Sequence, residues 1–198
     1  MPRFSEAEKE IIKQKLLSEA ERLFTVYGIK KVSIDELVQA TGIAKGSFYS
    51  FYSSKEQLFI EIVFNMQKKM WCETDKFLKA HSDLPSRELV KQAFIWMFEQ
   101  LDCYPLIRKI DRDTTEYLFR KLPKEVVEAH TLDDLIQIKN FENYGVSFTC
   151  GIEIAAKILQ ILALGFINLN QENEAVRIEV MNTVLNGVLK EIVGDKND

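Results

Sequence analysis

The chain has 198 residues, with 26 Lys and Arg against 30 Asp and Glu and a formal net charge of −4 at pH 7. Its 46% apolar and 28% charged residues are typical of a globular protein and exclude collagen-like, low-complexity and wholly disordered chains. The most apolar stretch, residues 158–169, is shorter than the ~20 residues of a membrane-spanning helix, and the N-terminus lacks an apolar signal segment. We therefore expect a cytoplasmic protein without a membrane partner.

Apolar residues recur every three or four positions throughout the chain, which predicts an all-α fold. Two capping-box patterns mark helix starts, Ser33-Ile34-Asp35-Glu36 and Ser54-Lys55-Glu56-Gln57. Gly28 is expected to stop the first helix. The expected helices, in chain order, span about residues 5–27, 33–42, 44–51, 54–78, 86–103, 106–110, 113–121, 123–143, 151–168 and 172–192.

The second and third expected helices are joined by a tight turn at Gly42, the spacing of a helix-turn-helix. The outer face of the third helix carries Lys45, Gly46, Ser47 and Tyr49. Lysine can donate to guanine or phosphate, hydroxyl groups bind phosphate oxygens, and glycine lets the backbone come close. Residues 1–55 also carry a net charge of +2 against −6 for the rest of the chain. Both features favour DNA as a partner of the N-terminal part.

Three segments near the N-terminus form a recognisable pattern. They are LVQATGIAKGSFY over residues 37–49, FY at 51–52 and SKEQLF at 54–59. With these segments, about residues 20–63 resemble the DNA-binding module of TetR-family transcriptional regulators. Ala44 departs from the family's pattern, because a Ser or Thr usually stands at the start of the recognition helix.

The resemblance implies a role for each matching position. Hydroxyl and ammonium groups are expected to contact phosphates or base edges, and the two tyrosines the sugar–phosphate backbone. Tyr52 could instead be a core residue between the first and fourth helices. The expected DNA-binding residues are Ser33, Lys45, Gly46, Ser47, Tyr49, Ser50, Tyr52 and Lys55.

A helix-turn-helix protein usually binds DNA as a dimer, because one short helix reads few bases. Residues 154–167 are apolar on nearly every face, so this helix must be covered on both sides. One side can face a partner subunit, although a central core helix of a monomer has the same pattern. The resemblance implies a four-helix homodimer interface made by this helix and the last one. The expected interface residues are Ile158, Leu162, Val180, Val184 and Val188.

The middle helices are rich in aromatic residues, which line small-molecule sites but also fill ordinary cores. The resemblance implies an effector pocket here, and the aromatic content favours a hydrophobic or aromatic small molecule. The expected lining residues are Phe94, Met97, Phe98, Leu101, Tyr104, Tyr117 and Phe141.

The sequence has no glycine-rich phosphate loop, no paired Cys or His at metal-binding spacing and no nucleophile motif. We therefore expect no catalytic residue, metal or cofactor. Cys72, Cys103 and Cys150 are far apart and odd in number, which indicates reduced thiols.

These observations predict an all-α protein with two parts. Residues 1–55 form a three-helix helix-turn-helix DNA-binding domain, and residues 56–198 form a larger domain of about nine helices for effector binding and dimerisation. The expected function is a ligand-responsive regulator, a repressor, that binds palindromic DNA as a dimer and is released by its effector. The alternatives are a cytosolic small-molecule-binding or catalytic helical protein that does not bind DNA, and a protein-interaction adaptor. The polar and basic outer face of the third helix favours the regulator.

Overall fold

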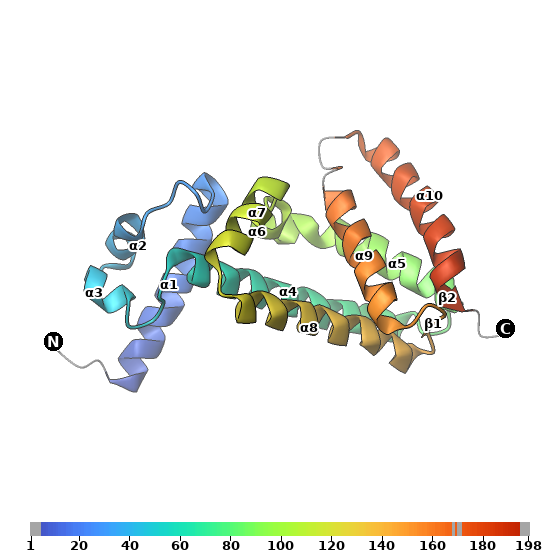
Figure 1. Cartoon of the computed structure of the whole chain (residues 1–198), viewed down its shortest axis with the longest axis horizontal. Coiled ribbons are helices and arrows are strands. Elements are labelled where there is room, and N and C mark those ends of the chain that lie inside the picture. Colours follow the sequence, from blue (N-terminus) through green and yellow to red (C-terminus); the bar gives the residue numbers. More distant parts are fainter. Residues whose placement is uncertain (1–4, 168, 170–171, 195–198) are drawn as a thin grey trace. The chain divides into compact units, whose positions relative to one another are not determined.

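A computed structural model of the chain describes residues 5–167, 169 and 172–194, apart from the side chains at 127 and 130–134. Helices make up most of the described residues, as the all-α prediction requires (Figure 1). The chain divides into two compact units. The first holds the chain up to Gln67 together with Tyr104–Lys124, and the second holds Lys68–Cys103 and the chain from Glu125 onward. The expected functional division at residues 55 and 56 stays a prediction.

The first unit is built around a long N-terminal helix. This helix, α1, packs against α2 and α6, and α2 packs against α3. Phe24 of α1 and Phe59 of α4 are buried, and their rings meet edge to face with centroids 5.3 Å apart. The elements with residues in this unit are α1 (Glu6–Tyr27), α2 (Ile34–Thr41), α3 (Lys45–Phe48), α4 (Lys55–Ala80), α6 (Pro105–Arg108) and α7 (Arg112–Lys121).

The helix starts in this unit follow from short-range hydrogen bonds. At α2, the Ser33 backbone N–H donates to Glu36 Oε2 (2.7 Å) and the Glu36 N–H donates to Ser33 Oγ (3.2 Å), which confirms the predicted capping box. At α4, the Gln57 N–H donates to Ser54 Oγ (3.2 Å), but the Gln57 side-chain oxygen accepts from the Ser53 N–H (2.9 Å). The second predicted capping box is thus half formed.

The turn between α2 and α3 needs a glycine. Gly42 has a left-handed backbone (φ 75°, ψ 29°), which other residues adopt at a cost. Ala44 is the N-cap of α3 and supplies no side-chain hydrogen bond, as its departure from the family pattern implied. Helix α3 ends at Phe48, earlier than the predicted residue 51, and the chain continues in a turn in which the Phe51 N–H donates to the Phe48 carbonyl (2.9 Å).

The second unit has its own apolar core, to which α4, α5, α8, α9 and α10 contribute. Helix α10 packs against α5 and α9. The further elements of this unit are α5 (Ser86–Glu99), η1 (Gln100–Cys103), α8 (Lys124–Lys139), η2 (Asn140–Tyr144), β1 (Ser147–Phe148), α9 (Ile152–Ile167), α10 (Glu174–Ile192) and β2 (Val193–Gly194). Within the described part of the chain, no helix is long and apolar enough to cross a membrane.

The strands β1 and β2 differ from the purely helical expectation. They pair antiparallel, with Ser147 opposite Gly194 and Phe148 opposite Val193. The Arg87 Nε donates to the Val193 carbonyl (2.9 Å) and so ties this short ladder to α5. Two-residue strands are too short to show the apolar alternation by which a strand is recognised in a sequence.

Candidate nucleic-acid interface

Helix α3 is held by one buried side chain and presents its other side chains outward. Phe48 is fully buried, while Lys45 and Gly46 are exposed and Ser47 is half-buried. Tyr49 is 52% exposed, and its ring lies edge to face on Phe48 with centroids 5.6 Å apart. The predicted outer face of α3 is therefore exposed enough for its side chains to enter a DNA groove.

The ammonium of Lys45 is paired with a carboxylate of α2. Lys45 Nζ lies 2.8 Å from Asp35 Oδ1 and 3.0 Å from Asp35 Oδ2, and both side chains are exposed. The hydrogen bond and the negative charge of Asp35 raise the pKa of Lys45 above its ordinary value. This ion pair was absent from the sequence-based predictions, because only the fold brings the two residues together.

Two serines predicted to contact DNA, Ser33 at phosphate and Ser50 at base edges or phosphate, flank the helix-turn-helix. Ser33 is exposed at the start of α2, and its hydroxyl group donates to Glu36 Oε2 (2.7 Å). Ser50 is exposed in the turn after α3, and its hydroxyl group donates to the Ser47 carbonyl (2.6 Å). A hydroxyl oxygen keeps acceptor capacity in such a bond and its proton can rotate, so both groups can exchange these partners for a phosphate.

The structure gives Lys55 backbone partners. Its Nζ lies 2.7 Å from the Ile29 carbonyl oxygen, 2.6 Å from that of Val32 and 3.4 Å from that of Lys30. An ammonium group has three N–H donors, and three carbonyl oxygens surround this one. Burial lowers the pKa of Lys55 below its ordinary value. Lys55 thus ties the start of α4 to the loop that leads into α2.

Tyr52, expected against the sugar–phosphate backbone, is 3% exposed, as its alternative core interpretation has it. Its hydroxyl group has no hydrogen-bond partner among the described residues. Burial, with a smaller contribution from the negative charge of Glu61, raises the pKa of this hydroxyl group. In this conformation Tyr52 supports Phe48, whose ring centroid lies 6.1 Å away, rather than facing outward.

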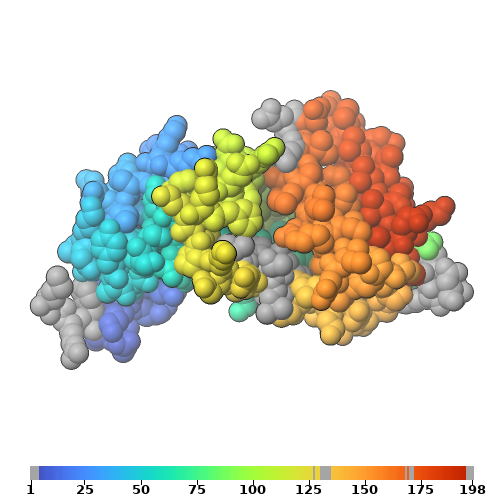
Figure 2. Space-filling model, viewed as in Figure 1, coloured from blue at the N-terminus to red at the C-terminus, as the bar shows by residue number. Residues whose placement is uncertain are grey.

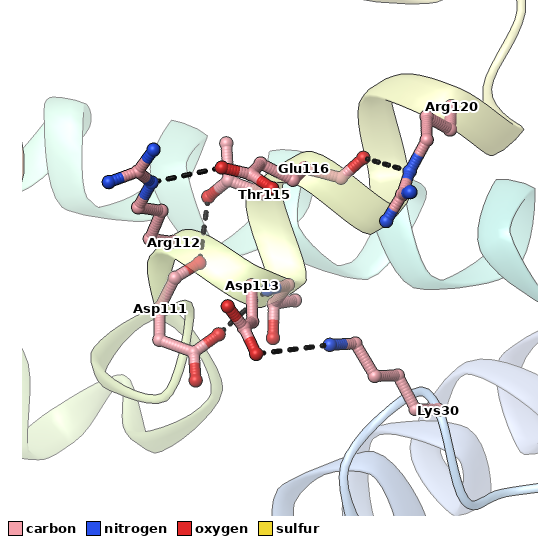
Figure 3. A network of polar contacts seen from close by, with 8 residues as sticks. Lys30, Asp111, Arg112, Asp113, Thr115, Glu116 and Arg120 are labelled. Carbon is pink, nitrogen blue, oxygen red and sulfur yellow. Dashed lines mark hydrogen bonds and ion pairs between the residues drawn. The ribbon is translucent and has the colours of Figure 1, made fainter.

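Helix α7 is joined to the helix-turn-helix side of the first unit by polar contacts that the sequence did not reveal. The Tyr117 hydroxyl group donates to the buried carboxylate of Glu56, at the start of α4. Lys30, in the loop before α2, lies 3.8 Å from Asp113 (Figure 3). Tyr117 was expected in an effector pocket, whereas its hydroxyl group is engaged within the first unit.

The other predicted pocket residues fall in different surroundings. Phe94 and Phe141 are buried in the core of the second unit, and Phe98 packs partly buried against it, with its ring 5.5 Å from that of Phe166. Met97 and Tyr104 are half-buried, and Leu101 is buried. Tyr104 belongs to the first unit and the four phenylalanine and leucine residues to the second, so the pocket stays a prediction.

The predicted dimer interface contains no fully buried residue. Ile158, Leu162, Val184 and Val188 are partly buried against the core of the second unit, and Val180 is 36% exposed. The same two helices carry more exposed apolar side chains that the prediction had left out. These are Ile154, Ile161, Leu164, Val176 and Ile178. Residues of α9 and α10 lie at the surface in Figure 2.

Within the described ranges, no group of three or more His, Cys, Asp or Glu side chains is placed to hold a metal ion. Cys72 and Cys103 are exposed and Cys150 is half-buried, and all three are free thiols.

The family model for bacterial regulatory proteins of the tetR family matches residues 16–62, the segment that carries the exposed face of α3. The HTH-type transcriptional regulator YhgD of Bacillus subtilis is 26% identical over 159 residues, which is 78% of this chain and 82% of YhgD. The chain belongs to the TetR family. It is a helix-turn-helix DNA-binding transcriptional regulator, and this family is not one of enzymes.

Solved structures of TetR-type regulators share the fold of this TetR-family chain. A TetR-family regulator from Mesorhizobium loti superposes with a TM-score of 0.60 at 17% identity, covering 93% of this chain and 98% of that one. SmeT, the repressor of a multidrug efflux pump of Stenotrophomonas maltophilia, gives a TM-score of 0.57 at 20% identity, covering 93% and 91%. At these identities the likeness concerns the fold alone. It confirms the all-α prediction for both the helix-turn-helix and the helical C-terminal part.

Proposed function

We propose that this TetR-family regulator is a cytoplasmic homodimeric repressor that binds a two-fold symmetric operator and leaves it when a small molecule binds. The observation that carries the proposal is the outer face of α3. Lys45 and Tyr49 are both about half exposed there, while Phe48 between them is fully buried. A short helix anchored in this way presents polar groups to a groove without losing its own packing.

The proposed DNA contacts are the exposed or half-buried residues around α3. They are Ser33, Lys45, Gly46, Ser47, Tyr49 and Ser50. We assign Lys55 and Tyr52 a supporting role, because the first holds the loop before α2 and the second is buried against Phe48. Both then affect DNA binding through the position of α2 and α3 rather than through contact.

The exposed apolar side chains of α9 and α10 support the homodimer. Ile154 and Ile161 of α9 are 57% and 60% exposed, and Val176 of α10 is 48% exposed. Apolar surface gathered on neighbouring helices marks a protein interface rather than a solvated face. Gly165 and Gly187 lie in the same two helices, and an added Cβ at either would meet no described atom within 4 Å beyond its chain neighbours and the nearby backbone of its own helix. Such positions leave room for a partner helix to approach closely.

We assign effector binding to the second unit. Phe98 and Met97 of α5 are only half-buried although both are large and apolar. Aromatic and aliphatic side chains of this kind suit a hydrophobic or aromatic ligand. A ligand that binds one conformation of this unit better than another shifts the protein toward that conformation, and release from DNA follows if the favoured conformation spaces the two α3 helices wrongly.

The test is selection of binding sites from random duplex DNA by the wild-type protein and by the double variant Lys45→Ala/Tyr49→Ala. We expect the wild type to enrich a motif with two-fold symmetry and the double variant to enrich none. The matched control is Tyr27→Ala/Lys69→Ala, which removes an exposed tyrosine of α1 and an exposed lysine of α4, neither of them among the proposed DNA contacts. The proposal fails if the wild type enriches only an asymmetric site, or if the α3 variant enriches the same motif as the wild type.

A further inference from the structure

Asp35 and Lys45 form a bridge across the helix-turn-helix. Asp35 lies in the first turn of α2, and Lys45 is the first residue of α3. The carboxylate meets the ammonium with both oxygens, at 2.8 and 3.0 Å, although the Asp35 side chain is 71% exposed and that of Lys45 is 52% exposed. The one lysine on the outer face of α3 is therefore paired with an acid before any DNA arrives.

We expect this pairing to lower the affinity for DNA of arbitrary sequence. Non-specific binding arises almost entirely from cations that neutralise phosphates and release counterions. A lysine already paired with a carboxylate adds little to that attraction, because the pair as a whole has no net charge. The hydrogen bond to Asp35 and its negative charge raise the pKa of Lys45, so the ammonium stays protonated.

At a specific site, the same pairing can orient the lysine toward a base. An ammonium group has three N–H donors, and two carboxylate contacts leave at least one N–H free. Guanine offers two neighbouring acceptors in the major groove, N7 and O6, and lysine is one of their usual partners. A lysine whose ammonium is held by a neighbouring carboxylate has fewer conformations. It can therefore donate to one position on the base edges but not to each of the nearby phosphates.

We propose that Asp35 is a specificity-determining residue, which acts through Lys45 to suppress binding to arbitrary DNA and to direct the lysine to a guanine of the operator. The proposal rests on the proposed function, since it requires α3 to read DNA. Asp35 acts as a positioning residue that needs no contact with the DNA itself. Its removal is therefore expected to make the protein bind more DNA, less selectively.

The experiment uses the full-length Asp35→Asn variant, which keeps the shape of the side chain and removes its charge. Affinity is measured for the operator selected by the wild type and for a random-sequence duplex of equal length, over a series of salt concentrations. We expect the variant to bind the random duplex several-fold more tightly, with a salt slope steeper by about 0.9, the value for one more phosphate neutralised. We expect the ratio of operator to random-duplex affinity to fall.

Two further variants assign the effect. Glu21→Gln removes one negative charge from an exposed position on α1 and should leave the ratio unchanged. In a Lys45→Met background, Asp35→Asn should no longer steepen the salt slope, because the released ammonium is missing. Asp35→Glu restores the charge and should recover part of the wild-type ratio.

The outcomes separate the two proposals. A wild type that prefers its operator while Asp35→Asn leaves the ratio and the random-duplex slope unchanged overturns the role of Asp35 alone. An equal change in the Glu21→Gln control also overturns it, because net charge would then explain the result. A wild type that shows no preference for any DNA sequence overturns the proposed function and this inference together.

Discussion

The ammonium of Lys55 lies 2.6 Å from the carbonyl oxygen of Val32, the residue before the Ser33 cap of α2. The same group lies 2.7 Å from the Ile29 carbonyl oxygen. The first residue of α4 thus holds the end of the loop from which α2 starts. We therefore expect the orientation of α2 and α3 to depend on this contact as well as on their shared core.

Lys55→Met tests this role, since methionine keeps most of the apolar stem and removes the ammonium. We expect the free energy of unfolding to fall by about 1–2 kcal/mol, because partly buried carbonyl groups lose a charged donor. Operator affinity should fall at every salt concentration with the slope unchanged, because α2 and α3 are less well placed. Urea unfolding and a salt series of binding constants measure both quantities.

The exposed Lys69→Met serves as the control for loss of a lysine on α4. A Lys55→Met variant of wild-type stability whose salt slope is shallower by about 0.9 would contradict the positioning role and show a phosphate contact instead.

The Tyr117 hydroxyl group predicts an alkaline limit to stability. Burial, followed by the hydrogen bond to Glu56, raises the pKa of Tyr117 from its ordinary value of 10.0 to about 12. A group whose pKa is higher in the folded state stabilises that state below its unfolded pKa. This contribution is lost as the pH rises through the folded pKa, so the window is pH 10 to 12.

Tyr117→Phe removes this contribution. The variant should unfold more easily than the wild type by about 1 kcal/mol at neutral pH. The difference should shrink between pH 10 and pH 12, where the wild type loses the hydrogen bond. Urea unfolding of both proteins across the pH series gives the comparison, and a difference that stays constant up to pH 12 would rule out this contribution from Tyr117.

The sequence predicted features that depend on neighbours along the chain. The start of α2 followed from Ser33 and Glu36, three residues apart, and the turn into α3 from Gly42. The outer face of α3 followed from the spacing of apolar residues, and Phe48 is buried as that spacing requires. The start of α2, the turn into α3 and the outer face of α3 are therefore readable from the sequence, whereas the end of α3, at Phe48 rather than residue 51, is not.

Contacts between residues far apart in the sequence could not be predicted from the sequence. Lys55 meets a carbonyl 23 residues earlier, and Tyr117 meets a carboxylate 61 residues earlier. Both residue types are also common on solvated surfaces, so the pattern gave no reason to pair them. Tyr52 was ambiguous for a related reason, because an amphipathic ring suits both a core and a DNA backbone.

The missing cap of α3 predicts a stabilising substitution. Ala44 has an extended backbone (φ −72°, ψ 147°), the conformation in which a serine hydroxyl group accepts from a backbone N–H of the first turn. Ala44→Ser should raise the free energy of unfolding by about 0.5–1 kcal/mol. Ala129→Ser, at an exposed position inside α8, is the control and should give no gain. An Ala44→Ser protein no more stable than the wild type in urea would show that the short α3 gains nothing from a cap.

The exposed face of α9 predicts which substitution separates the subunits. Leu162 packs against the core of the second unit, so a charge there disturbs folding as well as association. Ile161 is 60% exposed, so Ile161→Glu should leave the monomer folded while placing a charge in the proposed interface. We expect a monomer by sedimentation, wild-type helix content, and operator binding weaker by about tenfold or more, because a monomer contacts one half-site.

Ile136→Glu is the matched control, since Ile136 of α8 is 50% exposed and lies outside the proposed interface. An Ile161→Glu protein that sediments as a dimer would show that the interface does not include this face of α9. An Ile136→Glu protein that dissociates into monomers would show that the interface includes α8.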